Sequence, residues 1–318
     1  MPSRKRTWFL VRIAVYIAVI AGLYLYRGGV PWRQFLRGIG GSSAASGTLT
    51  VAGCDLAPRL ADRLLAAYGR EYPDLGIVRG DGGTNQALED LLGGSADVAL
   101  LYRLPTAREQ EWFREADGDT AIVVPVAVGA ILLLAGAGGG QPALLPADLG
   151  DVIAGRRPQL CRRLYVTDPN EGLWEAVRGA LGLDGPERPE GSPVIFLADA
   201  AAVTAAAGAE EGAWGLVGSL AQADDALAGP PPGLTYLALR AAPDSAAAAP
   251  TRENLADGRY PLHHMLYAAC RAGGGIEGAK FVTWLASGPG LRQVGRAGEV
   301  PARLVARPIQ LSRDPVRK

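Results

Sequence analysis

A glycine pair followed by threonine, and a single arginine further along the chain, are the residues best suited to binding a small ligand. Gly82, Gly83 and Thr84 follow a short apolar run, at a point where a helix is expected to begin. The free N–H groups of a helix N-terminus carry roughly half a positive charge, and glycine lets the backbone approach a bound oxyanion closely. Arg103 follows another apolar run and could pair with the same anion. These residues predict a site for an anionic or carboxylate-bearing solute rather than a cation.

Each of these residues also has an interpretation that involves local structure alone. The Gly-Gly-Thr sequence could do no more than form a turn and cap the following helix. Arg103 could form an ion pair with Glu109 instead of binding a ligand. Asp55 and Asn170 have side chains that serve well as helix N-caps, and capping is the interpretation favoured for both.

Residue types that enzymes use are few and do not cluster. The two histidines, His263 and His264, are adjacent, so they point in different directions and do not indicate a metal pair. The three cysteines, Cys54, Cys161 and Cys270, lie far apart without a C-x-x-C pair and are expected to be buried apolar residues. No G-x-S-x-G, P-loop or H-E-x-x-H motif occurs. We therefore expect neither an enzyme nor a cofactor or metal site.

The overall charge bears on the choice of partner. Thirty-two Lys and Arg residues balance thirty-two Asp and Glu residues, which gives a formal net charge of zero. A chain without a summed positive field does not attract nucleic acid electrostatically. Nucleic-acid binding is therefore not expected.

From residue 48 onward, short apolar runs alternate with helical patterns, which is typical of βαβ units and a mostly parallel sheet. The first expected strands are Leu49–Ala52, Gly76–Arg79 and Asp97–Leu101, and the helices between them are Pro58–Tyr72 and a segment from Thr84 to Leu92. The candidate binding residues follow the carboxyl ends of these strands. Open α/β sheets place ligand contacts at that edge.

A second lobe is expected to repeat this plan. The run Ala121–Leu134 is too apolar for a surface segment and contains Pro125 and Gly129, so it is interpreted as a buried strand that crosses between lobes. The elements expected after it are helix Pro146–Ala154, strand Leu164–Val166, helix Glu171–Leu181, helix Ala198–Gly208, strand Gly215–Val217 and an exposed loop at Gly229–Gly233.

The N-terminal segment predicts a membrane anchor. Trp8–Tyr26 is apolar apart from Arg12, and its length is about the 20 residues that a membrane-spanning helix needs. Basic residues flank both ends and only slightly favour a cytoplasmic N-terminus. A cleaved signal peptide is the alternative, but small residues suited to cleavage occur only at residues 43–45, well past the apolar run. The Gly- and Ser-rich residues that follow are interpreted as a linker.

Several stretches carry recognisable motifs in a fixed order. They are Leu49–Asp55, a strand with its turn; Gly80–Asn85, a glycine-rich turn; Ala96–Arg103, similar to D-I-x-x-x-S-R; Leu145–Gly155, similar to L-[ST]-x-x-x-[LV]-x-x-I-F-x-G; Pro250–Leu262, similar to PT-x-x-N-I-x-x-G-x-YPL; and Lys280–Pro301, a helix with a terminal G-[YF]-V-P turn. Together they resemble the phosphate-type family of periplasmic binding proteins, which serve bacterial ABC importers.

This resemblance implies an α/β, two-lobed periplasmic-binding-protein-like fold, here preceded by an N-terminal transmembrane helix. The expected divisions are residues 1–27 for the anchor, 28–47 for the linker, 48–125 for the first part of lobe I, 126–249 for lobe II, and 250–318 for the return to lobe I and the C-terminal tail. The implied function is a single-pass, membrane-anchored solute-binding protein facing the periplasm or cell exterior. It implies phosphate or another small anion as ligand and an ABC permease as partner.

The resemblance also implies which residues bind the ligand. They are Gly53, Cys54, Asp55, Gly83, Thr84, Asn85, Arg103, Asn170 and Gly172. The sequence departs from the family's pattern at the first turn, where Cys54 and Asp55 replace hydroxyl residues, and at Tyr102, which replaces the serine before the arginine.

A further departure bears on the identity of the ligand. Asp168 and Glu171 stand where the family has a S-G-T turn, and carboxylates at that position oppose a phosphate dianion. Weak phosphate binding, or none, is therefore expected. The alternative function is an anchored sensor or interaction module that kept the fold and lost the anion site.

The apolar run Trp8–Tyr26 leads to a first prediction. The mature protein should remain in the membrane pellet after carbonate extraction, with its N-terminus intact, because about 20 apolar residues hold a helix in the bilayer. N-terminal sequencing of the pelleted protein checks this. A soluble product that begins near Ser46 would contradict it. So would an acylated product that begins at Cys54, since Val51–Cys54 spells a lipoprotein box, although this box lies far past the apolar run.

Overall fold

The computed structural model describes residues 47–136, 143–183, 190–222 and 225–302. The predicted anchor, nearly all of the predicted linker and the end of the C-terminal tail lie outside these residues. Within the described ranges, none of the helices combines the length and the apolar character that crossing a membrane requires.

The first part of lobe I follows the predicted strand and helix order. It consists of β1 (Thr48–Ala52), η1 (Cys54–Leu56), α3 (Pro58–Glu71), β2 (Gly76–Arg79), α4 (Thr84–Gly93), β3 (Val98–Leu101) and α5 (Ala107–Asp117). Helix α5 was not predicted, although Thr106 and Glu109 form a capping box at its start. Phe113 is the one buried side chain of this helix, so its sequence lacks the repeated apolar positions that would indicate a helix.

Strands β4 (Ile122–Gly136) and β9 (His263–Cys270) join the two lobes. Strand β4 pairs antiparallel with β9 from Ile122 to Ala130 and then with β7 (Ala213–Gly218) from Ile131 to Ala135. The prediction that Ala121–Leu134 is a buried strand crossing between lobes is confirmed. The expected division between residues 125 and 126 falls inside this strand, five residues before its pairing partner changes.

Lobe II repeats the strand, turn and helix plan. Its elements are α6 (Pro146–Ile153), β5 (Arg163–Thr167), η2 (Pro169–Glu171), α7 (Leu173–Leu181), β6 (Val194–Leu197), α8 (Ala200–Ala209), β7, η3 (Ser219–Ala221), η4 (Ala226–Ala228), β8 (Leu234–Tyr236) and α9 (Arg252–Ala256). After β9, the chain continues through α10 (Ile276–Ala286), α11 (Gly288–Arg296) and β10 (Val300–Pro301), which pairs with the lobe I end of β4.

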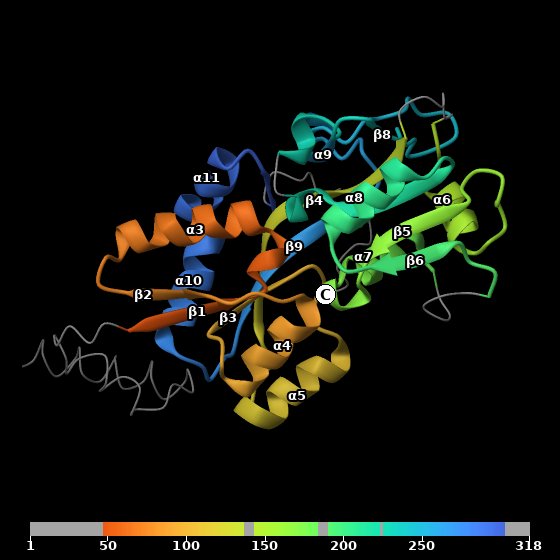
Figure 1. The fold of residues 1–318 in the computed structure, drawn as a ribbon. Helices are drawn as coiled ribbons and strands as arrows, with labels where there is room; N and C mark the ends of the chain where they lie inside the picture. Colours follow the sequence, from red (N-terminus) through yellow and green to blue (C-terminus); the bar gives the residue numbers. More distant parts are fainter. Residues whose placement is uncertain (1–46, 137–142, 184–189, 223–224, 303–318) are drawn as a thin grey trace, which may run out of the picture. The chain divides into compact units, whose positions relative to one another are not determined.

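The strands form one path in the order β2-β1-β3-β9-β4-β7-β5-β6, with β8 and β10 each pairing with β4 (Figure 1). Within each lobe the neighbouring strands β1, β2 and β3, or β5, β6 and β7, are parallel. Every pair that involves β4 or β9 is antiparallel. The expectation of a mostly parallel sheet is therefore wrong for the joining strands, because the chain enters lobe II along β4 and returns along β9 in the opposite direction.

The lobe I sheet is covered on both faces. Side chains of α3, α10 and α11 belong to a large apolar core, whereas α4 and α5 contribute to a separate, smaller cluster with Leu101 and Ala269. All three cysteines are buried and free, as predicted. Both faces of the sheet are thereby buried, and the turns at its strand ends are left to form the cleft described below.

Gly129 in β4 lies directly against His264 in β9, at the point where the two lobes join. A Cβ atom at Gly129 would lie 2.4 Å from His264 Nε2 and 2.9 Å from the Cγ of Leu220. His264 is 3% exposed, and burial lowers the pKa of its imidazole to about 3. The neutral ring is therefore confined against backbone that has no room for a side chain.

The second prediction is that Gly129→Ala lowers the free energy of unfolding by about 1–3 kcal/mol, because the added methyl group overpacks this contact. Gly93→Ala is the matched control, since its Cβ would meet nothing within 4 Å and it lies in α4. That change should be neutral, or stabilising by up to about 1 kcal/mol. Urea unfolding of both variants measures the difference, and equal stabilities would contradict the prediction.

Candidate functional site

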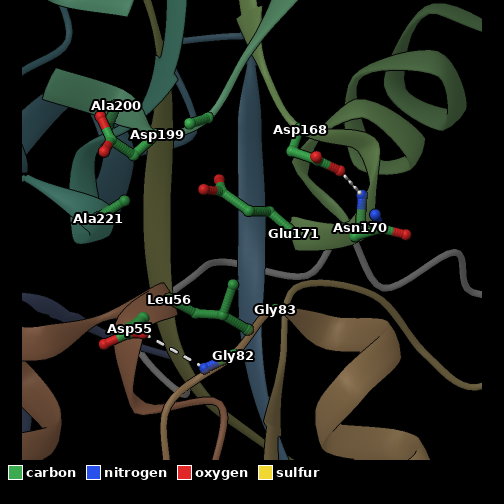
Figure 2. Close-up of a pocket in the computed structure, with 11 residues that line it drawn as sticks. Asp55, Leu56, Gly82, Gly83, Asp168, Asn170, Glu171, Asp199, Ala200 and Ala221 are labelled. Atoms are coloured by element: carbon green, nitrogen blue, oxygen red, sulfur yellow. Dashed lines mark hydrogen bonds between the residues drawn. The ribbon is translucent and has the colours of Figure 1, made fainter. Parts of the chain in front are cut away.

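A cleft of about 470 Å³ lies where the strand ends of the two lobes face each other (Figure 2). Its walls come from the turns after β1 and β2 in lobe I, from those after β5 and β6 in lobe II, and from η3. The lining residues are Asp55, Leu56, Gly82, Gly83, Asp168, Asn170, Glu171, Ala198, Asp199, Ala200 and Ala221. The carboxyl ends of strands in an open α/β sheet are where ligands are expected.

The turn after β1 contributes only one of its three predicted residues to the cleft. Gly53 has φ 77°, and a Cβ there would lie 2.5 Å from the carbonyl oxygen of Leu100, so the position requires glycine. Cys54 is fully buried, and desolvation raises the pKa of its thiol to about 11. Asp55 lines the cleft, accepts the N–H of Gly82 at 3.3 Å and pairs with Arg79 at 3.0 Å.

The glycine-rich turn of lobe I and the turn after β5 in lobe II touch each other directly. Thr84 Oγ1 donates to the carbonyl oxygen of Glu171 at 2.7 Å and accepts the N–H of Tyr102 at 3.0 Å. A Cβ at Gly83 would lie 2.4 Å from the Asn170 carbonyl oxygen. The Thr84 hydroxyl, predicted to bind a ligand, is therefore already occupied by protein groups on both sides.

Other predicted residues take part in the same contact. Asn85 Nδ2 donates to Asn170 Oδ1 at 3.4 Å. Gly172 has φ 87°, and a Cβ there would lie 2.6 Å from Thr84 Oγ1. The structure thus brings Gly83, Thr84, Asn85, Asn170 and Gly172 together, as contacts between the lobes.

Arg103 forms a bidentate ion pair with Glu109. The distances are 2.7 Å from Nη1 to Oε2 and 2.8 Å from Nη2 to Oε1, and Nη2 also donates to Asn85 Oδ1 at 2.8 Å. Both charged side chains are 15% exposed. Arg103 lines a separate groove between α4 and α5, together with Leu88 and Trp112. The ion pair with Glu109, which the sequence left open as an alternative, is what the structure contains.

Four carboxylates surround the cleft, and its lining within the described chain includes no Lys, Arg or His. Three of the four have partners nearby. Asp168 accepts the N–H of Asn170 at 2.8 Å, Asp199 caps α8 through the N–H of Ala202 at 2.8 Å, and Asp55 has the partners given above. Neither Asp55 nor Asn170 caps a helix, which corrects the capping interpretation: Gly53 and Asp168 stand at those N-cap positions.

Glu171 is the fourth carboxylate and the least compensated. Its side chain extends into the cleft between Asp199 and Leu56 (Figure 2). Its Oε2 atom is buried and makes no hydrogen bond of normal geometry among the described residues, although the Thr167 hydroxyl lies close enough to lower the pKa of the carboxyl. Desolvation raises the pKa of Glu171 to about 7, and the nearby charges of Asp168 and Asp199 act in the same direction. The centre of the cleft therefore holds a carboxyl group that titrates near neutral pH.

The sequence reasoning identified Asp168 and Glu171 as obstacles to an anion but did not predict Asp199, Leu56 or Ala221 as lining residues. Asp199 had a local signal, because an acidic residue between an apolar run and an alanine-rich helix is a preferred N-cap. Leu56 and Ala221 had none, since only the folded arrangement brings η1 and η3 to the cleft.

The strand order, the two crossing strands and the cleft at the strand ends define a two-lobed protein of the periplasmic-binding-protein type. The family model described as the PBP superfamily domain matches residues 40–289, and the chain belongs to this family. A comparison with curated proteins found no match.

Several solved structures share this fold. A phosphate ABC transporter substrate-binding protein from Clostridium perfringens, solved with bound phosphate, is 15% identical with a TM-score of 0.63, covering 80% of this chain and 99% of its own. An ABC-type phosphate transport receptor from Vibrio cholerae is 15% identical with a TM-score of 0.60, covering 79% and 99%. A full-length OxyR from Pseudomonas aeruginosa is 13% identical with a TM-score of 0.53, covering 91% and 79%. At these identities the likeness establishes the fold alone.

The third prediction concerns the pH dependence of stability. The pKa of Glu171 is raised from its ordinary value of 4.5, which applies to the unfolded chain, to about 7 in the folded one, so its contribution to stability falls as pH rises between these values. Glu171→Gln removes this loss. The difference in free energy of unfolding, variant minus wild type, should therefore be about 2 kcal/mol larger at pH 8 than at pH 5, which means that the variant gains relative stability as pH rises.

Urea unfolding at the two pH values measures this difference. The control is Glu253→Gln, which removes one negative charge from a side chain that is 77% exposed on α9. Its relative stability should not change with pH in this range. A Glu171→Gln difference that is the same at both pH values would contradict the raised pKa.

Proposed function

We propose that this chain is an extracytoplasmic solute-binding protein of an ABC-type importer, tethered to the membrane by its N-terminal segment. The observation that carries the proposal is the cleft between two lobes that β4 and β9 join. In this arrangement a solute enters between the lobes, the lobes close around it, and the permease recognises the closed form.

The residues at the cleft support a solute-binding role better than catalysis. Its lining offers carboxylates, backbone groups and small apolar side chains. Among the residues that the structure describes, no three His, Cys, Asp or Glu side chains are placed to hold a metal ion. The chemistry available there is electrostatic and hydrogen-bonding, which serves recognition.

The ligand of the C. perfringens protein, phosphate, is a poor fit to this cleft. The hydroxyl of Thr84 and the guanidinium of Arg103, the two side chains that would favour an anion, are engaged by Glu171 and Glu109. Four carboxylates face the space that remains, and like charges repel strongly where water is excluded. A small solute other than a phosphate dianion is the ligand that these contacts support.

The fourth prediction tests this choice. A calorimetric titration of the full chain with inorganic phosphate at pH 7.5 should show no binding up to millimolar concentration. The dianion would enter a cleft whose described lining includes no cationic side chain. A sub-micromolar dissociation constant would contradict the prediction. It would mean that the carboxylates turn away and that Arg103 leaves Glu109 on binding.

A second candidate function is an anchored sensor or interaction module without a solute. The direct contact between the two lobes favours it, since Thr84 and Gly83 already touch the lobe II turn without a bound ligand. A thermal-shift screen separates the two functions, because a ligand that binds only the native state raises its unfolding temperature. Stabilisation by any small solute supports the binding protein, and none across amines, oxyanions, carboxylates and sugars supports the module.

A further inference from the structure

We propose that the solute bound in this cleft carries a cationic nitrogen head group, an alkylammonium or guanidinium, held by Glu171 with Asp168 and Asp199 around it. This inference rests on the proposed function, since it names the class of solute for the same cleft. It reverses the charge expected from the sequence, because the residues that predicted an anion are engaged elsewhere in the protein.

The charge balance of the cleft is the first argument. Asp55 shares Arg79 with Asp62 and Asp81, and this arginine is 36% exposed. Asp168 and Asp199 each accept a backbone N–H group among the described residues, and such a group does not neutralise their charge. A carboxylate in a partly desolvated site is costly unless a cation pairs with it. A positively charged solute would supply the charge that the lining side chains lack.

The buried carboxyl of Glu171 gives a second argument. Thr167, at the end of β5, is fully buried, and its hydroxyl faces the Glu171 carboxyl closely enough to lower the pKa of that group. This hydroxyl can supply one donor, whereas an ionised carboxylate has about four acceptor sites. Glu171 Oε2 is buried and makes no hydrogen bond of normal geometry among the described residues, so the carboxylate has acceptor sites left for a bound donor. An ammonium group carries three N–H donors and no acceptor.

The shape and the other lining residues favour an organic cation over a metal ion. The space of about 470 Å³ is in the range of small-molecule sites, roughly 300–1,000 Å³. Leu56, Ala200 and Ala221 line it beside the carboxylates, which provides an apolar surface for an alkyl chain. Within the described ranges the carboxylates do not converge into a group that could hold a metal.

Binding of such a solute should depend on pH through Glu171. Four titratable groups face it from different elements: Asp55 from η1, Asp168 from the turn before η2, Asp199 from the N-cap of α8, and Tyr102 after β3. The three aspartates raise the pKa of Glu171 further after desolvation, to about 7. A cation pairs only with the ionised carboxyl, so affinity should rise roughly tenfold from pH 6 to pH 8.

The fifth prediction uses calorimetry on the full chain with putrescine and arginine as probes, and with succinate and calcium chloride as the contrasting dianion and divalent cation. At least one of the two nitrogen cations should bind at pH 8, more weakly at pH 6. Glu171→Gln should weaken that binding at least tenfold, because it removes a desolvated ion pair while keeping the side-chain shape. Asp199→Asn should weaken it less and still cap α8, since asparagine is an equally good N-cap.

The control variant is Glu253→Gln, which should bind the probe as the wild type does, and unfolding temperatures confirm that each variant is folded. Unchanged affinity in Glu171→Gln overturns the inference. Binding of succinate or calcium in place of both nitrogen cations also overturns it but leaves the proposed solute-binding function standing. If neither nitrogen cation binds and no solute stabilises the chain in the thermal-shift screen, the inference and the proposed function both fail.

Discussion

The cleft exists because the antiparallel pairing of β4 with β9 holds the strand ends of the two lobes opposite each other. Strand β4 exchanges β9 for β7 between Ala130 and Ile131, so a single strand belongs to the sheets of both lobes. Gly129 and His264 pack together immediately beside this exchange. The strand that joins the lobes therefore changes its pairing partner at the place where the sheets of the two lobes meet.

The charge of the cleft shows how one fold can serve different ligands. In this fold the strand ends lead into turns and helix N-termini. The free backbone N–H groups there suit an anion, regardless of the side chains. Here the backbone preference is countered by carboxylates on the turns, and the N-terminus of α4 faces the lobe II turn through Thr84. The fold therefore indicates where the candidate site lies, whereas the carboxylates on three of its turns set the charge of the cleft.

The sequence predicted the elements that have strong local signals. Strand β2 was predicted with its exact bounds, and α3, α4 and β5 within one or two residues, because period and turn residues are local properties. Helix α5 and the short strands β6 and β8 were not predicted, because their apolar patterns are weak or span only a few residues. The structure places the predicted turns at one cleft, so they stay the candidate site. Whether Arg103 faces that cleft or Glu109 depends on side-chain contacts that no local pattern encodes.

The two glycines at the contact between the lobes have a consequence for selectivity. A Cβ at Gly83 would meet the backbone of Asn170, and a Cβ at Gly172 would meet the side chain of Thr84, so the closest approach of the lobes depends on the absence of a side chain at both positions. If the lobes close on a solute as proposed, this contact limits how near they come, so the smallest size of the closed cleft is set by the protein and not by the solute. Such a cleft would select candidates by their size as well as by their charge.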